Sequence, residues 1–145
     1  MWPPLRVLRQ KFATWMFCRS IGHALALNRA EGRRDGLTLV RACNRLEVQW
    51  RARRVHPWDR DLSPAERART LEEQSLSDAE AAILRLFEAL PQVDVVDLTV
   101  LDHSSDQVLM AGTVQRSTLD QVRMLLSVRM RLQQLGISYR FPEPT

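Results

Sequence analysis

The side chains best suited to chemistry lie together in the segment His56-Pro57-Trp58-Asp59-Arg60-Asp61. His56 could act as a general base oriented by Asp59 or Asp61, and the three side chains could together bind a divalent metal. The alternative is a loop at the exit of a strand, in which Trp58 anchors the segment and the charges face water. Because no second histidine lies nearby in sequence, we expect the loop and assign neither a catalytic residue nor a metal site.

A second group, Asp102, His103 and Asp106, is interpreted as a hairpin loop, because Asp and Ser favour such loops through local hydrogen bonds. The sequence contains no Gly-rich phosphate loop, no G-x-S-x-G and no H-E-x-x-H. These absences remove specific enzyme classes, so we expect a non-catalytic protein without a cofactor. Two cysteines and three scattered histidines form no zinc pattern, and the low cysteine count is typical of a cytoplasmic protein.

Positive charge is concentrated in the first part of the chain. Residues 1–60 hold thirteen basic and four acidic side chains, whereas residues 61–145 hold eight basic and thirteen acidic ones. Every basic residue except Lys11 is arginine, whose planar fork of donors matches phosphate and carboxylate. The candidates for binding an anion or a nucleic-acid backbone are Arg33, Arg34, Arg51, Arg53 and Arg140. In the alternative interpretation, these arginines lie on a surface that faces water or contacts the acidic half of a second copy.

The length of 145 residues suits one domain with an arm, and 45% apolar and 26% charged residues exclude wholesale disorder. Residues 5–30 show helical spacing of apolar side chains, which include Phe12 and Trp15. We expect a basic helical arm over residues 1–44, with a polar turn at 31–36 and a helix at 37–44. The short apolar run near the start lacks a clear cleavage site, so no signal peptide is expected.

Residues 45–142 are expected to form the main domain. Leu46, Val48 and Trp50 alternate with charged or polar residues, which predicts a strand over 45–55. Capping boxes at Ser63-Pro64-Ala65-Glu66 and Ser77-Asp78-Ala79-Glu80 predict helices near 64–74 and 78–90. A third helix is predicted over 117–135, with Gly136 as the residue that ends it and with these residues on its inner face: Val122, Leu125, Leu126 and Leu132. Strands are predicted near 93–101, 108–114 and 137–141.

The resulting β-α-β-β-α-β order predicts the α+β class and a ferredoxin-like sandwich. In that topology the last strand neighbours the first, which would place Arg140 beside Arg51 and Arg53, on the face opposite Val48 and Trp50. The helices cover one face of such a sheet. The amphipathic N-terminal helix, from this chain or from a second copy, is expected to cover the other face.

Residues 77–141 resemble the bacterial BON domain in their order of helix, two strands, helix and strand. The segment Val108-Leu109-Met110-Ala111-Gly112-Thr113-Val114 carries the resemblance, which covers under half of the chain. The sequence departs from the family where a glycine would open the second strand. The resemblance implies a small module linked to membrane or lipid association.

The function expected from the sequence is that of a non-catalytic cytoplasmic interaction module, which forms a homo-oligomer or a subunit of a larger assembly. The opposite charges of the two parts of the chain favour association, because unlike ends of two copies attract. One alternative is binding of a nucleic-acid backbone through the arginine surface. Another is attachment to a membrane surface through the N-terminal helix, whose aromatic residues lie beside Arg6 and Arg9.

Overall fold

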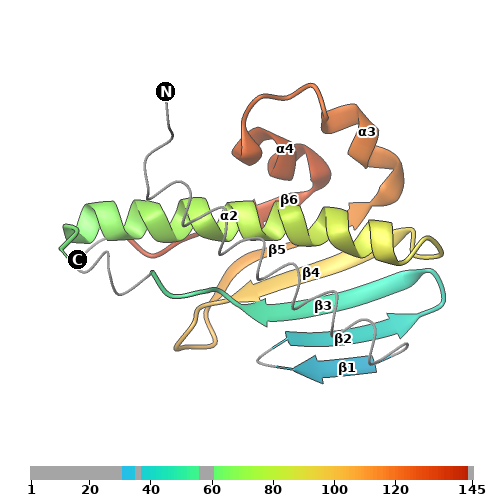
Figure 1. Ribbon diagram of the computed structural model, residues 1–145, viewed down its shortest axis with the longest axis horizontal. Coiled ribbons are helices and arrows are strands. Elements are labelled where there is room, and N and C mark those ends of the chain that lie inside the picture. The colour runs from blue at the N-terminus through green and yellow to red at the C-terminus, as the bar shows by residue number, and fades with distance from the viewer. Residues whose placement is uncertain (1–30, 35–36, 56–60, 144–145) are drawn as a thin grey trace.

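The computed structural model describes residues 31–34, 37–55 and 61–143. In this part of the chain, six strands form a single sheet and a layer of helices packs against it (Figure 1). The strands are β1 (Glu31–Arg34), β2 (Leu37–Ala42), β3 (Arg45–Arg51), β4 (Val95–Leu101), β5 (Val108–Gln115) and β6 (Ile137–Tyr139). The helices are α2 (Pro64–Ala89), the 3₁₀ turn η2 (Arg116–Thr118), α3 (Leu119–Val122) and α4 (Val128–Leu135). The protein is therefore of mixed α+β class, as the sequence predicts.

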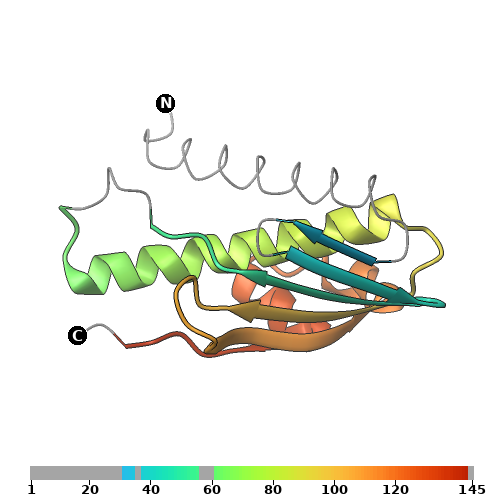
Figure 2. The same ribbon diagram turned by 90° about the horizontal axis from the view of Figure 1, so that it is seen from below.

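The six strands lie side by side in chain order, from β1 to β6. Neighbouring strands are antiparallel except β3 and β4, which are parallel and are joined by α2. A parallel connection needs such a crossover, because the chain must return to the starting end of the sheet. In Figure 2 the strands form one twisted layer, and α2 lies along one side of it.

Strand β3 confirms the alternation read from the sequence. Leu46, Val48 and Trp50 are buried, and the residues between them are exposed. The buried residues join one core with Leu98 of β4 and Ile83 of α2. Burial of these apolar side chains away from water is the main force that holds the helices onto the sheet.

The prediction of a helix at 37–44 is wrong, and the polar turn predicted at 31–36 is a strand over residues 31–34, while residues 35–36 lie outside the described residues. Residues 31–34 and 37–42 form β1 and β2, which extend the sheet beyond β3. Leu39, Cys43 and Leu46 have helical spacing in sequence, but the chain reverses at Cys43, where φ is 55°. That reversal lets Leu39 pair with Val48 on the core face of the sheet. The rest of the predicted arm, residues 1–30, lies outside the described residues.

The strand order also differs from the predicted ferredoxin-like order. There the last strand would lie beside β3, whereas β6 pairs with β5 at the far edge of the sheet. Gly112 of β5 permits this position. A Cβ atom there would overlap the carbonyl oxygen of Gly136 and lie 2.9 Å from the Cα atom of Ile137. The close approach of the two backbones therefore selects glycine at this point of β5.

Helix α2 is one continuous helix, not the two helices that the two capping signals predict. Ser63 and Glu66 form the predicted capping box at its start, with Pro64 in the first turn. The second signal, Ser77-Asp78-Ala79-Glu80, lies within the helix. Asp78 is buried there and pairs with Arg53 at the exit of β3. Asp78 is therefore explained by its pairing with Arg53, which is distant in sequence, and not by a role in starting a helix.

The second half of the chain confirms the predicted hairpin and divides the predicted third helix. Strands β4 and β5 pair over the expected range. The expected helix over 117–135 is interrupted between α3 and α4, where Ser127 begins a new helix by accepting a hydrogen bond from the Met130 amide. Gly136 ends α4 in the left-handed conformation, as predicted.

The sheet face opposite the helices carries polar side chains in its centre. The Asp97 carboxylate accepts hydrogen bonds from Arg45 of β3 and from Thr113 of β5. Thr99 and Gln49 lie in the next row across the strands. A face of this kind can meet water directly, as in many sheets whose other face is buried. The predicted cover by the N-terminal helix concerns residues outside the described part of the chain.

Candidate functional site

The fold places Arg140 away from the other four arginines that are predicted to bind an anion, and it engages Arg51 and Arg53 in internal contacts. Arg33 and Arg34 belong to the edge strand β1. Arg140 follows β6, three strand spacings from β3, which is about 14 Å. Arg51 and Arg53 lie at the end of β3, and both are engaged within the protein.

Arg51 of β3 binds the β4–β5 hairpin loop through hydrogen bonds. Its guanidinium donates hydrogen bonds to the carbonyl oxygens of Asp102 (3.1 Å) and Ser105 (2.7 Å) and to Oδ1 of Asp106 (2.7 Å). Arg53 lies on the helix side of the sheet, not on the outward face as predicted, and its Nε is 2.6 Å from Oδ2 of Asp78. These contacts give both guanidinium groups a role in stabilising the fold.

The first candidate cluster, His56, Asp59 and Asp61, falls largely outside the described residues. Only Asp61 is described, and it is exposed just before α2. Within residues 31–34, 37–55 and 61–143, no group of three His, Cys, Asp or Glu side chains is placed to hold a metal ion.

The second cluster has the geometry of the predicted hairpin loop. Oδ2 of Asp102 accepts hydrogen bonds from the Ser104 amide (3.2 Å) and from the hydroxyls of Ser104 and Ser105 (both 3.1 Å). Burial raises the pKa of Asp102, but these hydrogen bonds outweigh that effect and hold the pKa below its ordinary value. The carboxylate thus orders the loop that carries His103.

The most unusual surface of the described chain lies at α3 and α4. Met124 and Leu126, in the connection between these helices, are 88% and 96% exposed. Met130 on α4 and Leu84 on α2 are about half exposed. Isolated apolar residues on a surface are common, whereas exposed apolar residues that lie close together are typical of interaction sites. We call these four residues, Leu84, Met124, Leu126 and Met130, the apolar surface.

A groove of about 570 Å³ lies between α2 and the α3–α4 region, and Leu84 of the apolar surface forms part of its wall. The other apolar residues that line it are Ile83, Leu119, Val122 and Leu135. Arg131 and Glu80 lie at the same groove and pair with each other, with distances of 2.6 Å and 2.9 Å. The groove therefore offers apolar contacts beside charges that already have partners.

The Arg131 side chain holds the backbone of the connection between α3 and α4 in place. Arg131 donates hydrogen bonds to the carbonyl oxygens of Leu125 (2.8 Å) and Leu126 (3.1 Å) while it pairs with Glu80 of α2. The hydrogen bond with Glu80 raises the pKa of Arg131 above its ordinary value. A loop fixed in this way presents its apolar side chains at a low entropic cost of binding.

Sequence reasoning missed the apolar surface. It predicted Leu126 on the inner face of one continuous helix, whereas the break between α3 and α4 turns this side chain outward. The available signal was Ser127, which is a favoured residue for starting a helix and precedes α4 directly.

Comparisons with known proteins give no match: no family model, no curated protein and no solved structure is similar to this chain. The element order implied by the resemblance to the BON domain is present, because α2 is followed by β4, β5, two short helices and β6. No family model supports membership. Among the described residues, no helix combines the length and apolar character needed to cross a bilayer.

Proposed function

We propose that the protein is a non-catalytic interaction module that forms a homo-oligomer through the apolar surface. The observation that carries this proposal is the exposure of Met124 and Leu126 on a loop whose backbone is fixed by Arg131. Burying such side chains against another protein removes apolar area from water, which is the main driving force of association.

A second copy of this chain is the proposed occupant of the surface. Charges of both signs lie beside the exposed loop, where Asp120 of α3 and Arg123, which directly follows α3, are mostly exposed and pair with each other at 3.2 Å. In a two-fold interface each surface contacts its own copy, so Arg123 of one protomer can approach Asp120 of the other. Methionine side chains adapt to irregular partners, which suits Met124 and Met130 to such a contact.

Sedimentation velocity of the full chain and of matched variants tests this proposal. Leu126→Glu places a charge where the second copy would dock, and it leaves the core unchanged because the side chain is 96% exposed. Val108→Glu makes the same change at an exposed residue of β5, outside the apolar surface. We expect the wild-type chain and the Val108 variant to sediment as dimers or larger, and the Leu126 variant as a monomer. A monomeric wild type, or an equal loss of assembly in both variants, would overturn the proposal.

A further inference from the structure

The connection between α3 and α4, residues 123–127, forms a loop that protrudes beside the groove between these helices and α2. Arg123 at the start of this loop lines the groove, and so does Arg131 of α4, whereas Met124 and Leu126 lie outside its lining. In Figure 1 the connection between α3 and α4 bends away from α2, so the loop does not cover the groove of its own chain. The same region of the surface therefore holds a protruding apolar loop and an apolar recess.

The groove suits an insert that is apolar and uncharged. Its volume of about 570 Å³ lies in the range of pockets that take small molecules, so it is large enough for leucine or methionine side chains. Every charged residue of its lining has a partner within the described chain: Glu80 pairs with Arg131, Asp120 pairs with Arg123, and Arg116 donates to carbonyl oxygens at the end of α2. A charged ligand would have to displace one of these partners, whereas an apolar side chain is buried without doing so.

Met124 and Leu126 are inserts of this kind, and a second copy of the chain supplies them. In a two-fold pair each surface contacts its own copy, so a segment that protrudes must meet a recess. Because the loop adjoins the groove, one rotation can place the loop of each protomer in the groove of the other. Two loops packed against each other would cover only one side of each side chain. Insertion covers the whole side chain and the groove walls, and the gain rises with the apolar area removed from water.

We propose that each protomer inserts the loop of residues 123–127 into the groove of a second copy, with Leu126 of one protomer against Leu84 of the other. This inference rests on the proposed self-association and specifies which parts of the two copies meet. The dimer then contains two identical contacts. Arg131 lines the groove and also donates hydrogen bonds to the carbonyl oxygens of the loop, so the insert and its receptor are held in one arrangement before they bind.

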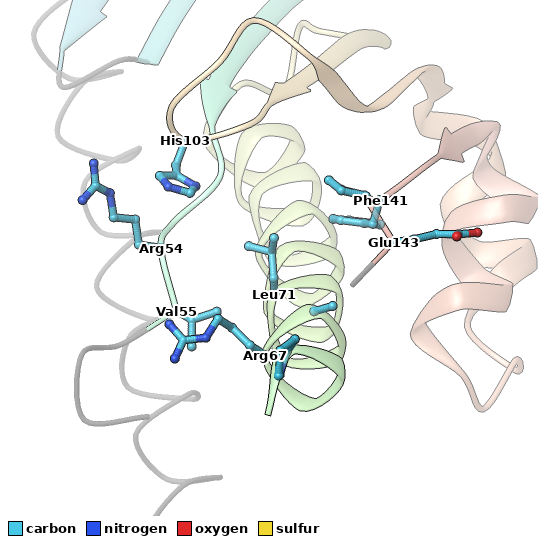
Figure 3. Close-up of a pocket in the computed structure, with 10 residues that line it drawn as sticks. Arg54, Val55, Arg67, Leu71, His103, Phe141 and Glu143 are labelled. Carbon is cyan, nitrogen blue, oxygen red and sulfur yellow. The ribbon is translucent and has the colours of Figure 1, made fainter. Parts of the chain in front are cut away.

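The other recess that could receive the loop lies at the opposite end of α2. It is a cleft of about 360 Å³ in which Val55, Leu71 and Phe141 form apolar walls (Figure 3). Leu71 and Leu84 are thirteen residues apart on α2, or about 20 Å. Two loop contacts in one pair would there require the whole surface between the ends of α2 to match its own copy. A single contact of this kind joins unlike surfaces and adds further copies, so it predicts assemblies larger than a dimer.

Complementary charges on two separate variants test the loop–groove contact by sedimentation velocity. Leu84→Lys and Leu126→Glu should each weaken the homodimer about a hundredfold, because each homodimer carries the change at two contacts and each contact loses about tenfold. In an equal mixture of the two variants, one contact sets the new carboxylate against the new ammonium, and the other contact is native. We expect this mixture to form dimers at a concentration at which each variant alone is a monomer. Recovery of the dimer also shows that both variants are folded.

Two controls separate this contact from a general effect of charge. A mixture of Leu126→Glu with Leu84→Glu sets like charges at the same contact and should stay monomeric. Val108→Lys should dimerise as wild type does, because Val108 lies outside the apolar surface and is 47% exposed, close to the 51% of Leu84. Loop insertion is overturned, while self-association stands, if Leu84→Lys dimerises like wild type or if the two mixtures behave alike. A monomeric wild type overturns both proposals.

Discussion

Arg53 and Asp78 join the end of β3 to the middle of α2 through two hydrogen bonds, of 2.6 Å and 2.9 Å. The Asp78 side chain is only 3% exposed, and the Arg53 side chain is 25% exposed. Gln74, one helical turn earlier, donates hydrogen bonds to the carbonyl oxygens of Arg53 and Arg54. The crossover helix is thereby fixed to the strand that precedes it.

Replacing Arg53 with alanine should destabilise the fold by about 3 kcal/mol, because Asp78 would remain buried without this partner. The measurement is the free energy of unfolding in urea. Arg54→Ala is the control, since Arg54 is the next residue and is exposed. If the two variants lose equal, small amounts of unfolding free energy, the Arg53–Asp78 pair does not hold α2 in place.

This pair also explains where sequence reasoning failed. Ser77 and Asp78 have the residue types of a helix start, and only the position of Arg53 in the fold shows that Asp78 is a buried partner. The same limitation applies to β2, because the helical spacing of Leu39 and Cys43 gives no sign of the reversal that pairs Leu39 with Val48. In both cases the local structure depends on contacts between segments that are far apart in sequence.

Elements whose pattern is local were predicted correctly. The alternation in β3 and β4, the capping box at Ser63 and the C-cap at Gly136 each depend on neighbouring residues. The position of β6 beside β5 was not predictable in this way, because it brings Gly112 close to Gly136, which is distant in sequence. The candidate surfaces were missed for a related reason, since each is assembled from segments far apart in sequence.

Arg116 caps the C-terminal end of α2. Its guanidinium donates hydrogen bonds to the carbonyl oxygens of Phe87 (3.0 Å), Leu90 (2.8 Å) and Val93, and it lies 4.8 Å from the centre of the Phe87 ring. The Phe87 and Leu90 carbonyl groups lie at the end of α2, where no further turn of the helix supplies N–H donors, so a cation here is favourable. Arg116→Lys should cost about 2 kcal/mol of unfolding free energy, because one ammonium cannot replace the planar set of donors.

Thermal and urea denaturation measure this loss, and Arg69→Lys on the exposed face of α2 is the control. Hydrogen exchange adds a local readout, because the last turn of α2 should exchange faster in the Arg116 variant. Unchanged exchange at Leu86 and Leu90 would contradict a capping role.

Gly112→Ala should destabilise the protein by about 2 kcal/mol, because the added methyl group overlaps the backbone at Gly136 and Ile137. The effect should be concentrated at β6, whose pairing with β5 depends on this contact. Hydrogen exchange at Ile137, compared with β3, checks the location. Ala111→Gly, one residue earlier in β5, is a control for the change of residue type alone.

The Asp97 network should make stability depend on acidity. The hydrogen bond from Arg45 is the largest cause that holds the pKa of Asp97 below its ordinary value, and Thr113 adds a second hydrogen bond of 2.6 Å. The stabilisation is present above the ordinary pKa of an aspartate, about 3.9, and is lost as the pH falls through the lower folded value. Wild type should therefore exceed Asp97→Asn in stability at neutral pH, with a gap that closes in acid.

Urea unfolding of both proteins across an acidic pH series measures that gap. A difference of constant size down to the lowest pH would contradict the proposed role of the ionised carboxylate. Thr113→Val, which removes only the second hydrogen bond, should reduce the gap without abolishing it.

The molar mass of the wild-type chain in solution tests self-association most directly. Size-exclusion chromatography with light scattering, over the micromolar range, should give at least twice the chain mass of 16.8 kDa. Leu126→Glu should give the mass of one chain under the same conditions. A wild-type mass of one chain at every concentration would contradict the proposal that the apolar surface joins two copies.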